Sequence, residues 1–435
     1  MRKDAQPPTG GIYRPRNPRV SPLYQCVRRH SDELDAAGLL HRSVEAEVLE
    51  RFLDCGDLHK GFARVYCDQC GHDYLLAYSC KTRYFCPSCH QKRMLAYGEW
   101  LENNVLAPVP HRQYVFALPK LIRPFFRHRR RYLGELCRLV AVLLKAGFKV
   151  MAPDGQPAFV LYVQTFGDLV TFNPHIHALV ADGVFLPTGT FRLLPPLPEA
   201  ALREALRHKV LHFLSSEGVL DTELAQRMLK WRHSGFSVHN RVRTKAVDAK
   251  GRQRLARYMI RCPFSLEKMR YDTESGMVIY RSKPHATLKR NYQLMPAIKW
   301  LRLLMNHIPD KYEHLVRYYG YYSNRSRGAR RLVENVDDTA GSIHISEPPA
   351  NTRRKANWAR LIQKVYEVDP LECVNCGSTM RIIALIDDID VVERILKHLK
   401  GWDPQPDTIT PAGPDPPWPE GETLSLTYHP VPDIA

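Results

Sequence analysis

The sequence predicts an α+β fold in which one sheet is covered by helices on at least one face. Three short runs rich in β-branched and aromatic residues predict buried strands, at Tyr114–Leu118, Phe159–Gln164 and His175–Val180. Longer segments of helical character separate or follow them, at about 124–146 and 202–215. Strands and helices interleaved in this way bury their apolar faces by packing in layers.

Two local signals refine this arrangement. The third strand is expected to end at the turn-forming pair Asp182-Gly183. Near the start of the chain, Ser43–Asp54 has apolar residues at helical spacing after a possible cap at Ser43, which predicts a short helix.

Composition and motifs divide the chain into five expected parts. These are a poorly ordered N-terminus (1–20), a helix with a zinc-binding domain (21–105), a central α+β domain (106–289), a helical basic C-terminal region with a CxxC half-site (290–400), and an acidic proline-rich tail (401–435). Within the fourth part, a strand-like Arg381–Ile386 and a helix-like segment follow the CxxC.

The charge balance points to a polyanionic partner. The 435 residues include 63 Lys and Arg against 45 Asp and Glu, a net charge of +18. The tail from Gly401 onward holds six of the acids and no Lys or Arg, so the first 400 residues carry +24. Because neutralised phosphates release counterions, nucleic acid is the expected partner. We expect an intracellular protein, since no apolar signal segment or membrane-length run is present.

Cysteine spacing predicts a structural zinc site. Two CxxC pairs stand fifteen residues apart, Cys67 with Cys70 and Cys86 with Cys89. Four thiolates at this spacing are typical of a closed tetrahedral zinc site. Cys80 and His90 are nearby alternatives that could replace a ligand.

A third CxxC, Cys373 with Cys376, has no second pair after it. It could bind zinc incompletely, combine with ligands from elsewhere in the chain, or bind no metal.

The segment His175-Ile176-His177 places two imidazoles at alternate positions of a predicted strand, and therefore on one face. Such a pair can hold a divalent cation if a neighbouring element supplies a third ligand. Gln164 and Asp168 are the candidates for that ligand.

A histidine pair followed by a tyrosine on a helix resembles the HUH endonucleases, and Tyr258 occupies such a segment, LARYMIRCPFS. The chain further resembles the transposases of the insertion sequence 91 family, including its common-region (ISCR) branch. The segments that carry this resemblance run in matching order over roughly residues 20–400: SCKTRYFCPSCHQKR, YVFALP, QTFGDLVTFNPHIHALVADGVF, LVRYYGYYSNRSRGARR and CVNCGSTMRIIALI. Many members have a second tyrosine four residues before the first, where this chain has Arg254, so the resemblance is to the single-tyrosine branch.

The resemblance implies a rolling-circle DNA transposase with an HUH-type antiparallel sheet, whose nuclease domain would be residues 106–289. His175 and His177 would hold Mg²⁺ or Mn²⁺, and Tyr258 would attack single-stranded DNA to form a 5'-phosphotyrosine. The residues expected to contact DNA are Arg254, Arg257, Arg261, Arg317, Tyr318 and Tyr319.

Two other functions fit the same residues. A rolling-circle replication initiator would use this chemistry at a replication origin. A zinc-dependent DNA-binding protein without catalysis would keep the histidines and Tyr258 as structural residues. The expected partner is DNA, as single strands or hairpins at element ends, in the bacterial cytoplasm.

Overall fold

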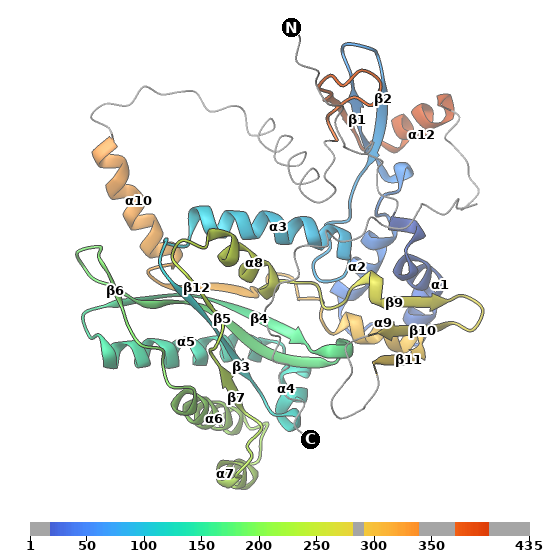
Figure 1. Cartoon of the computed structure of the whole chain (residues 1–435). Helices are drawn as coiled ribbons and strands as arrows, with labels where there is room; N and C mark the ends of the chain where they lie inside the picture. Colours follow the sequence, from blue (N-terminus) through green and yellow to red (C-terminus); the bar gives the residue numbers. More distant parts are fainter. Residues whose placement is uncertain (1–17, 282–290, 339–369, 400–435) are drawn as a thin grey trace.

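The computed structural model describes residues 18–281, 291–338 and 370–399. It contains one seven-stranded and two three-stranded antiparallel sheets with helices packed against them, which confirms the predicted α+β class (Figure 1). The predictions for residues 1–17 and for the tail lie outside the described residues. No helix in the described ranges combines the length and apolar character needed to cross a bilayer.

The central sheet has the strand order β12-β4-β5-β3-β7, with β6 paired to β5 and β8 paired to β3. Its strands are β3 (His111–Ala117), β4 (Gln156–Phe166), β5 (Phe172–Phe185), β6 (Phe191–Leu193), β7 (Ser237–His239), β8 (Arg243–Thr244) and β12 (Val316–Gly320). The three strands predicted from the sequence therefore lie side by side at its centre as β3, β4 and β5.

One face of this sheet packs against four helices (Figure 1). These are α4 (Arg123–His128), α5 (Arg131–Met151), α6 (Glu199–Ser216) and α7 (Thr222–Lys230). Ile176, Ala178 and Val180 of β5 belong to the large core between the sheet and these helices. The single helix expected at 124–146 is two helices, α4 and α5.

The other face packs against α3 (Pro87–Asn104) and α8 (Ala249–Met259) (Figure 1). Leu179 and Ala181 of β5 meet Leu101 of α3 and Leu255 of α8 in a second core. The two-residue periodicity of β5 thus separates its side chains between two helical layers.

The predicted turn at Asp182-Gly183 is wrong, because β5 continues through it to Phe185. The Asp182 carboxylate is held by Arg112 at 3.0 Å and by Arg243 at 2.5 Å. A Cβ at Gly183 would lie 2.1 Å from the carbonyl oxygen of Arg192, so the glycine permits the close approach of β6. Both residues therefore serve strand pairing rather than a turn.

The C-terminal region is mixed rather than helical. It contains α9 (Ala297–Met305), α10 (Asn324–Asp338) and α12 (Ile389–His398). It also contains β11 (Tyr292–Pro296), β12 and β13 (Arg381–Ile386). Because β12 pairs with β4, the central sheet takes an edge strand from beyond residue 289.

The two smaller sheets flank the N-terminal helices α1 (Pro22–Ala36) and α2 (Ser43–Leu53). One has the order β11-β10-β9 and includes β9 (Met269–Asp272) and β10 (Met277–Arg281). The other has the order β13-β1-β2 and includes β1 (Phe62–Tyr66) and β2 (Asp73–Ala77). In this last sheet a strand from the C-terminal region pairs with an N-terminal hairpin.

Candidate active site and cysteine clusters

The two predicted metal-binding histidines lie on β5 and face the layer formed by α3 and α8. His175 pairs with Gln164 of β4, so their side chains share that face. Ile176, between the histidines, packs into the core on the opposite face. The alternation along β5 therefore directs His175 and His177 toward the helix that carries Tyr258.

Hydrogen bonds fix the orientation of both imidazoles. His175 Nδ1 donates to the carbonyl of Asn173 at 2.7 Å, which leaves Nε2 unprotonated in the neutral ring. The two Nε2 atoms lie 3.0 Å apart, and the side-chain amide of Gln113 is hydrogen-bonded to His177 Nδ1 at 2.7 Å. Burial lowers the pKa of His175 to about 4 and that of His177 well below its usual value. Both rings are neutral near pH 7, the form that can bind a metal ion.

Gln164 connects the histidine strand to the tyrosine helix. It is fully buried, and its Nε2 donates to the carbonyls of Tyr258 at 3.1 Å and Met259 at 2.7 Å. Its Oε1 is buried and has no hydrogen-bond partner among the described residues. A buried acceptor left in this state costs free energy unless a cation or another donor satisfies it. Of the two predicted third ligands, Asp168 forms no compact ligand cluster with the histidines in the described structure.

Tyr258 lies near the C-terminal end of α8, which begins after the Asp248 cap. Its ring centroid is 5.8 Å from that of His177 with the ring planes nearly perpendicular. The Arg261 guanidinium lies 4.6 Å from the Tyr258 ring centroid. Burial raises the pKa of Tyr258, while the charge of Arg261 lowers it and that of Asp168 raises it. The structure thus brings the predicted nucleophile, the histidine pair and one predicted arginine together.

The other two arginines of this segment differ in their surroundings. Arg257 packs against α3, where a Cβ at Gly98 would lie 2.9 Å from its Cγ. Arg254 is half-buried on the same helix. Of these three arginines, Arg261 is the one that lies over the Tyr258 ring.

The remaining residues predicted to contact DNA lie on the edge strand β12, and their side chains point to different sides of the sheet. Tyr318 faces the α3 side, where its ring meets Trp100 edge-on at 6.0 Å. Tyr319 stacks on Phe159 at 5.2 Å on the opposite side of the sheet. Arg317 donates to a carbonyl in the first turn of α5 at 3.3 Å. These three residues therefore do not form one continuous surface.

The structure contradicts the predicted four-cysteine site, because the two N-terminal CxxC pairs belong to different clusters. One cluster consists of Cys55, Cys80, Cys86 and Cys89, and the other of Cys67, Cys70, Cys373 and Cys376. Cys67 and Cys70 lie at the tip of the β1-β2 hairpin, whereas Cys86 and Cys89 lie at the start of α3. The spacing of the two CxxC pairs is typical of one zinc site, but the hairpin holds the first pair and α3 holds the second pair in different places.

The first cluster fits zinc. The Sγ atoms of its four cysteines lie within 4.8 Å of one another, with Cys89 at 3.8 Å from Cys55 and 3.6 Å from Cys80. A zinc tetrahedron with Zn–S bonds of about 2.3 Å has S–S edges of about 3.8 Å. Cys80, considered only as an alternative ligand, is a member, and Cys55 was missed because it belongs to no CxxC motif.

His90, the other alternative ligand, lies next to this cluster but binds elsewhere. It accepts from the Tyr84 N–H at 3.3 Å through Nδ1, and its Nε2 donates to the carbonyl of Ile260 at 2.6 Å. Ile260 caps the tyrosine helix. His90 thus connects the cysteine-bearing start of α3 to the end of α8.

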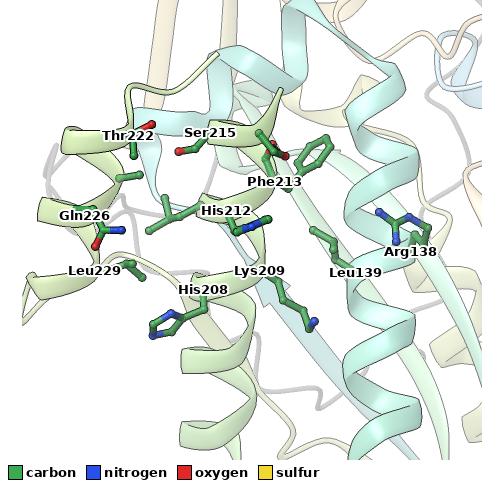
Figure 2. Close-up of a pocket in the computed structure, with 13 residues that line it drawn as sticks. Arg138, Leu139, His208, Lys209, His212, Phe213, Ser215, Thr222, Gln226 and Leu229 are labelled. Carbon is green, nitrogen blue, oxygen red and sulfur yellow. Dashed lines mark hydrogen bonds between the residues drawn. The ribbon is translucent and has the colours of Figure 1, made fainter. Parts of the chain in front are cut away.

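A surface pocket between α5, α6 and α7 lies away from this site (Figure 2). Basic side chains line part of it, among them Arg138, Lys209 and His212. These helices cover the face of the sheet opposite His175 and His177, so the pocket does not reach the tyrosine.

Two family models of transposase regions match the parts of the chain that hold these residues. A family model described as "Transposase zinc-binding domain" matches residues 26–118, and one described as "Putative transposase" matches residues 158–330. The first span holds all of the first cysteine cluster, and the second holds His175, His177 and Tyr258.

Two curated relatives match most of the chain. The transposase for insertion sequence element IS801 of Pseudomonas savastanoi pv. phaseolicola is 26% identical over 378 residues, 82% of this chain and 87% of that protein. Putative transposase y4qJ of Sinorhizobium fredii is 28% identical over 398 residues, 85% of this chain and 96% of that protein. No solved structure matches significantly. The matched zinc-binding and transposase regions, in the predicted order, together with the two relatives, support the assignment of this chain to the insertion sequence 91 family of transposases.

Proposed function

We propose that this transposase nicks and rejoins single-stranded DNA at element ends by tyrosine phosphoryl transfer, as a single-tyrosine HUH enzyme in rolling-circle transposition. The observation that carries the proposal is the position of Tyr258, whose ring centroid lies 5.8 Å from that of His177, one of two buried imidazoles whose Nε2 atoms are 3.0 Å apart. A nucleophile beside a cation-binding pair is the arrangement that phosphoryl transfer requires.

The three side chains that would hold Mg²⁺ or Mn²⁺ are His175, His177 and Gln164. These side chains suit a divalent cation because the imidazoles are neutral and because the buried Gln164 Oε1 lacks a hydrogen-bond partner among the described residues. Amide oxygen and imidazole nitrogen are suitable ligands for such cations. The bound cation would polarise the scissile phosphate and stabilise charge in the transition state.

In the proposed reaction, the Tyr258 oxygen attacks phosphorus and loses its proton. A tyrosine–phosphorus ester forms at the 5' side, and the released 3' oxygen takes a proton and leaves as a hydroxyl. Arg261, 4.6 Å from the Tyr258 ring centroid, favours the phenolate and can pair with a flanking phosphate. The phosphodiester energy stays in the ester, so the same hydroxyl can later reverse the attack without ATP.

The experiment is incubation of labelled single-stranded DNA carrying element ends with the full chain and Mn²⁺, followed by a denaturing gel. Tyr258→Phe should abolish the covalent adduct, while Tyr292→Phe, the same change at an exposed position on β11, should retain it. His175→Ala with His177→Ala should abolish the adduct at any Mn²⁺ concentration. An adduct that survives Tyr258→Phe would show that another residue is the nucleophile, and no adduct with any DNA would favour a non-catalytic DNA-binding protein.

A further inference from the structure

The second cysteine cluster joins segments about 300 residues apart in sequence. Cys67 and Cys70 follow β1, whereas Cys373 and Cys376 precede β13, and Figure 1 shows the C-terminal α12 beside the N-terminal β1 and β2. The Sγ atoms of Cys67 and Cys376 are 3.5 Å apart, and those of Cys70 and Cys373 are 3.4 Å apart. These separations exceed a disulfide bond of about 2.05 Å and approach the edge of about 3.8 Å of a zinc tetrahedron.

The two CxxCG segments adopt the same backbone geometry. In each, the N–H of the first cysteine donates to the carbonyl five residues later at 2.8 Å. The glycine N–H donates back to the first cysteine's carbonyl, at 3.0 Å for Gly71 and 2.8 Å for Gly377. Both glycines have positive φ, 73° and 69°. In each, the residue before the first cysteine pairs with the residue three beyond the second. Two separate segments thus form matching turns, each presenting two thiols.

The packing around this cluster is too small to hold the C-terminal segment by itself. Apart from cysteines, the buried members of its hydrophobic cluster in the described structure are Val65 and Met380. A second small group unites Phe62 of β1 with Val392 and Leu396 of α12. Units with cores of this size are usually stabilised by a metal ion or a disulfide.

We propose that Cys67, Cys70, Cys373 and Cys376 form a second zinc site, separate from the first cluster, in which one ion joins the C-terminal β13-α12 unit to the N-terminal hairpin. Four thiolates leave no open position on the metal, so the site is structural. It lies partly outside the matched zinc-binding domain, because Cys373 and Cys376 come from beyond residue 118. The half-site of the sequence is thereby completed by ligands from the other end of the chain.

The test is the zinc content of the purified full chain, measured by mass spectrometry after desalting. The wild type should hold about two zinc ions per chain. Cys373→Ser with Cys376→Ser should hold about one, and so should Cys86→Ser with Cys89→Ser, because each removes one site. Cys137→Ala, which removes a buried thiol outside both clusters, should retain about two.

Three results would overturn the proposal. One is a wild type with about one zinc ion that is lost in Cys86→Ser/Cys89→Ser, which would leave the first cluster as the single site. Another is a Cys373→Ser/Cys376→Ser protein that keeps about two. The third is a disulfide between Cys67 and Cys376 or between Cys70 and Cys373, detected by alkylation and peptide mass mapping.

If the serine variants do not fold, Cys70→His decides, since histidine can replace a cysteine ligand. The cobalt-loaded Cys70→His protein should keep about two metal ions with a shifted thiolate absorption, and one ion with an unshifted spectrum would overturn the site. If the Cys373→Ser/Cys376→Ser protein folds, hydrogen exchange supplies a second readout. The β13 amides should lose protection while those of β5 keep it, and unchanged β13 exchange would show that the metal does not hold this strand.

Discussion

Replacing Gln164 by leucine should loosen the tyrosine helix and weaken metal binding together. The change removes two hydrogen bonds, to the carbonyls of Tyr258 and Met259. The Tyr258 carbonyl still accepts from Arg261 N–H at 3.3 Å, whereas the Met259 carbonyl loses the Gln164 amide as its donor. One lost bond at about 0.5–1 kcal/mol and one unsatisfied buried carbonyl at about 1–3 kcal/mol give a local cost of about 1.5–4 kcal/mol, of which we take about 2 kcal/mol as the cost after partial relaxation. That cost corresponds to a fall of about 30-fold in amide protection in α8.

The assay combines hydrogen exchange of α8 with a manganese titration of adduct formation. Gln164→Leu should raise the Mn²⁺ concentration for half-maximal adduct by at least about 10-fold, since it removes a proposed ligand. Gln164→Glu keeps a ligand oxygen and should recover much of the manganese response. Gln226→Leu, an exposed change in α7 across the sheet (Figure 2), should alter neither quantity. Unchanged manganese dependence in Gln164→Leu would refute the ligand role, and unchanged α8 exchange would refute the bridging role.

Three further predictions concern stability. His90→Ala should leave the carbonyl of Ile260 without its imidazole donor, at a local cost of about 1–3 kcal/mol. The variant should form the adduct more slowly and still bind zinc. Adduct formation at the normal rate would contradict the link between α3 and α8. Burial lowers the pKa of His111 to about 3 and that of His307 to about 4, whereas a histidine in the unfolded chain has a pKa of about 6.5. The contribution of each histidine to the free energy of unfolding is therefore complete above pH 6.5 and is lost as the pH falls toward its folded-state pKa. Between pH 7 and 5 each should cost about 2 kcal/mol, and acid titration of His111→Gln should show a shallower loss than the wild type. Gly183→Ala should destabilise the β5-β6 pairing because its Cβ would lie 2.1 Å from a carbonyl oxygen; a melting temperature equal to that of the wild type would exclude this steric account.

Local sequence patterns determined the parts of this protein that depend on near neighbours. Runs of β-branched and aromatic residues identified β3, β4 and β5, and the alternation of side chains along a strand placed His175 and His177 on one face. The CxxCG motifs specified two tight turns because glycine readily adopts the positive φ that each requires. Local signals were misleading where a distant element intervened, as at Gly183, whose small size serves the approach of β6 rather than a turn.

Tertiary structure decided which of these local units meet. CxxC spacing alone grouped Cys67 and Cys70 with Cys86 and Cys89, but pairing of β1 with β13 brings Cys373 and Cys376 to the first pair instead. The bridge from Gln164 to the tyrosine helix likewise joins residues about 95 positions apart. Such contacts form when whole elements pack to bury their apolar faces, and spacing along the chain carries no record of that packing.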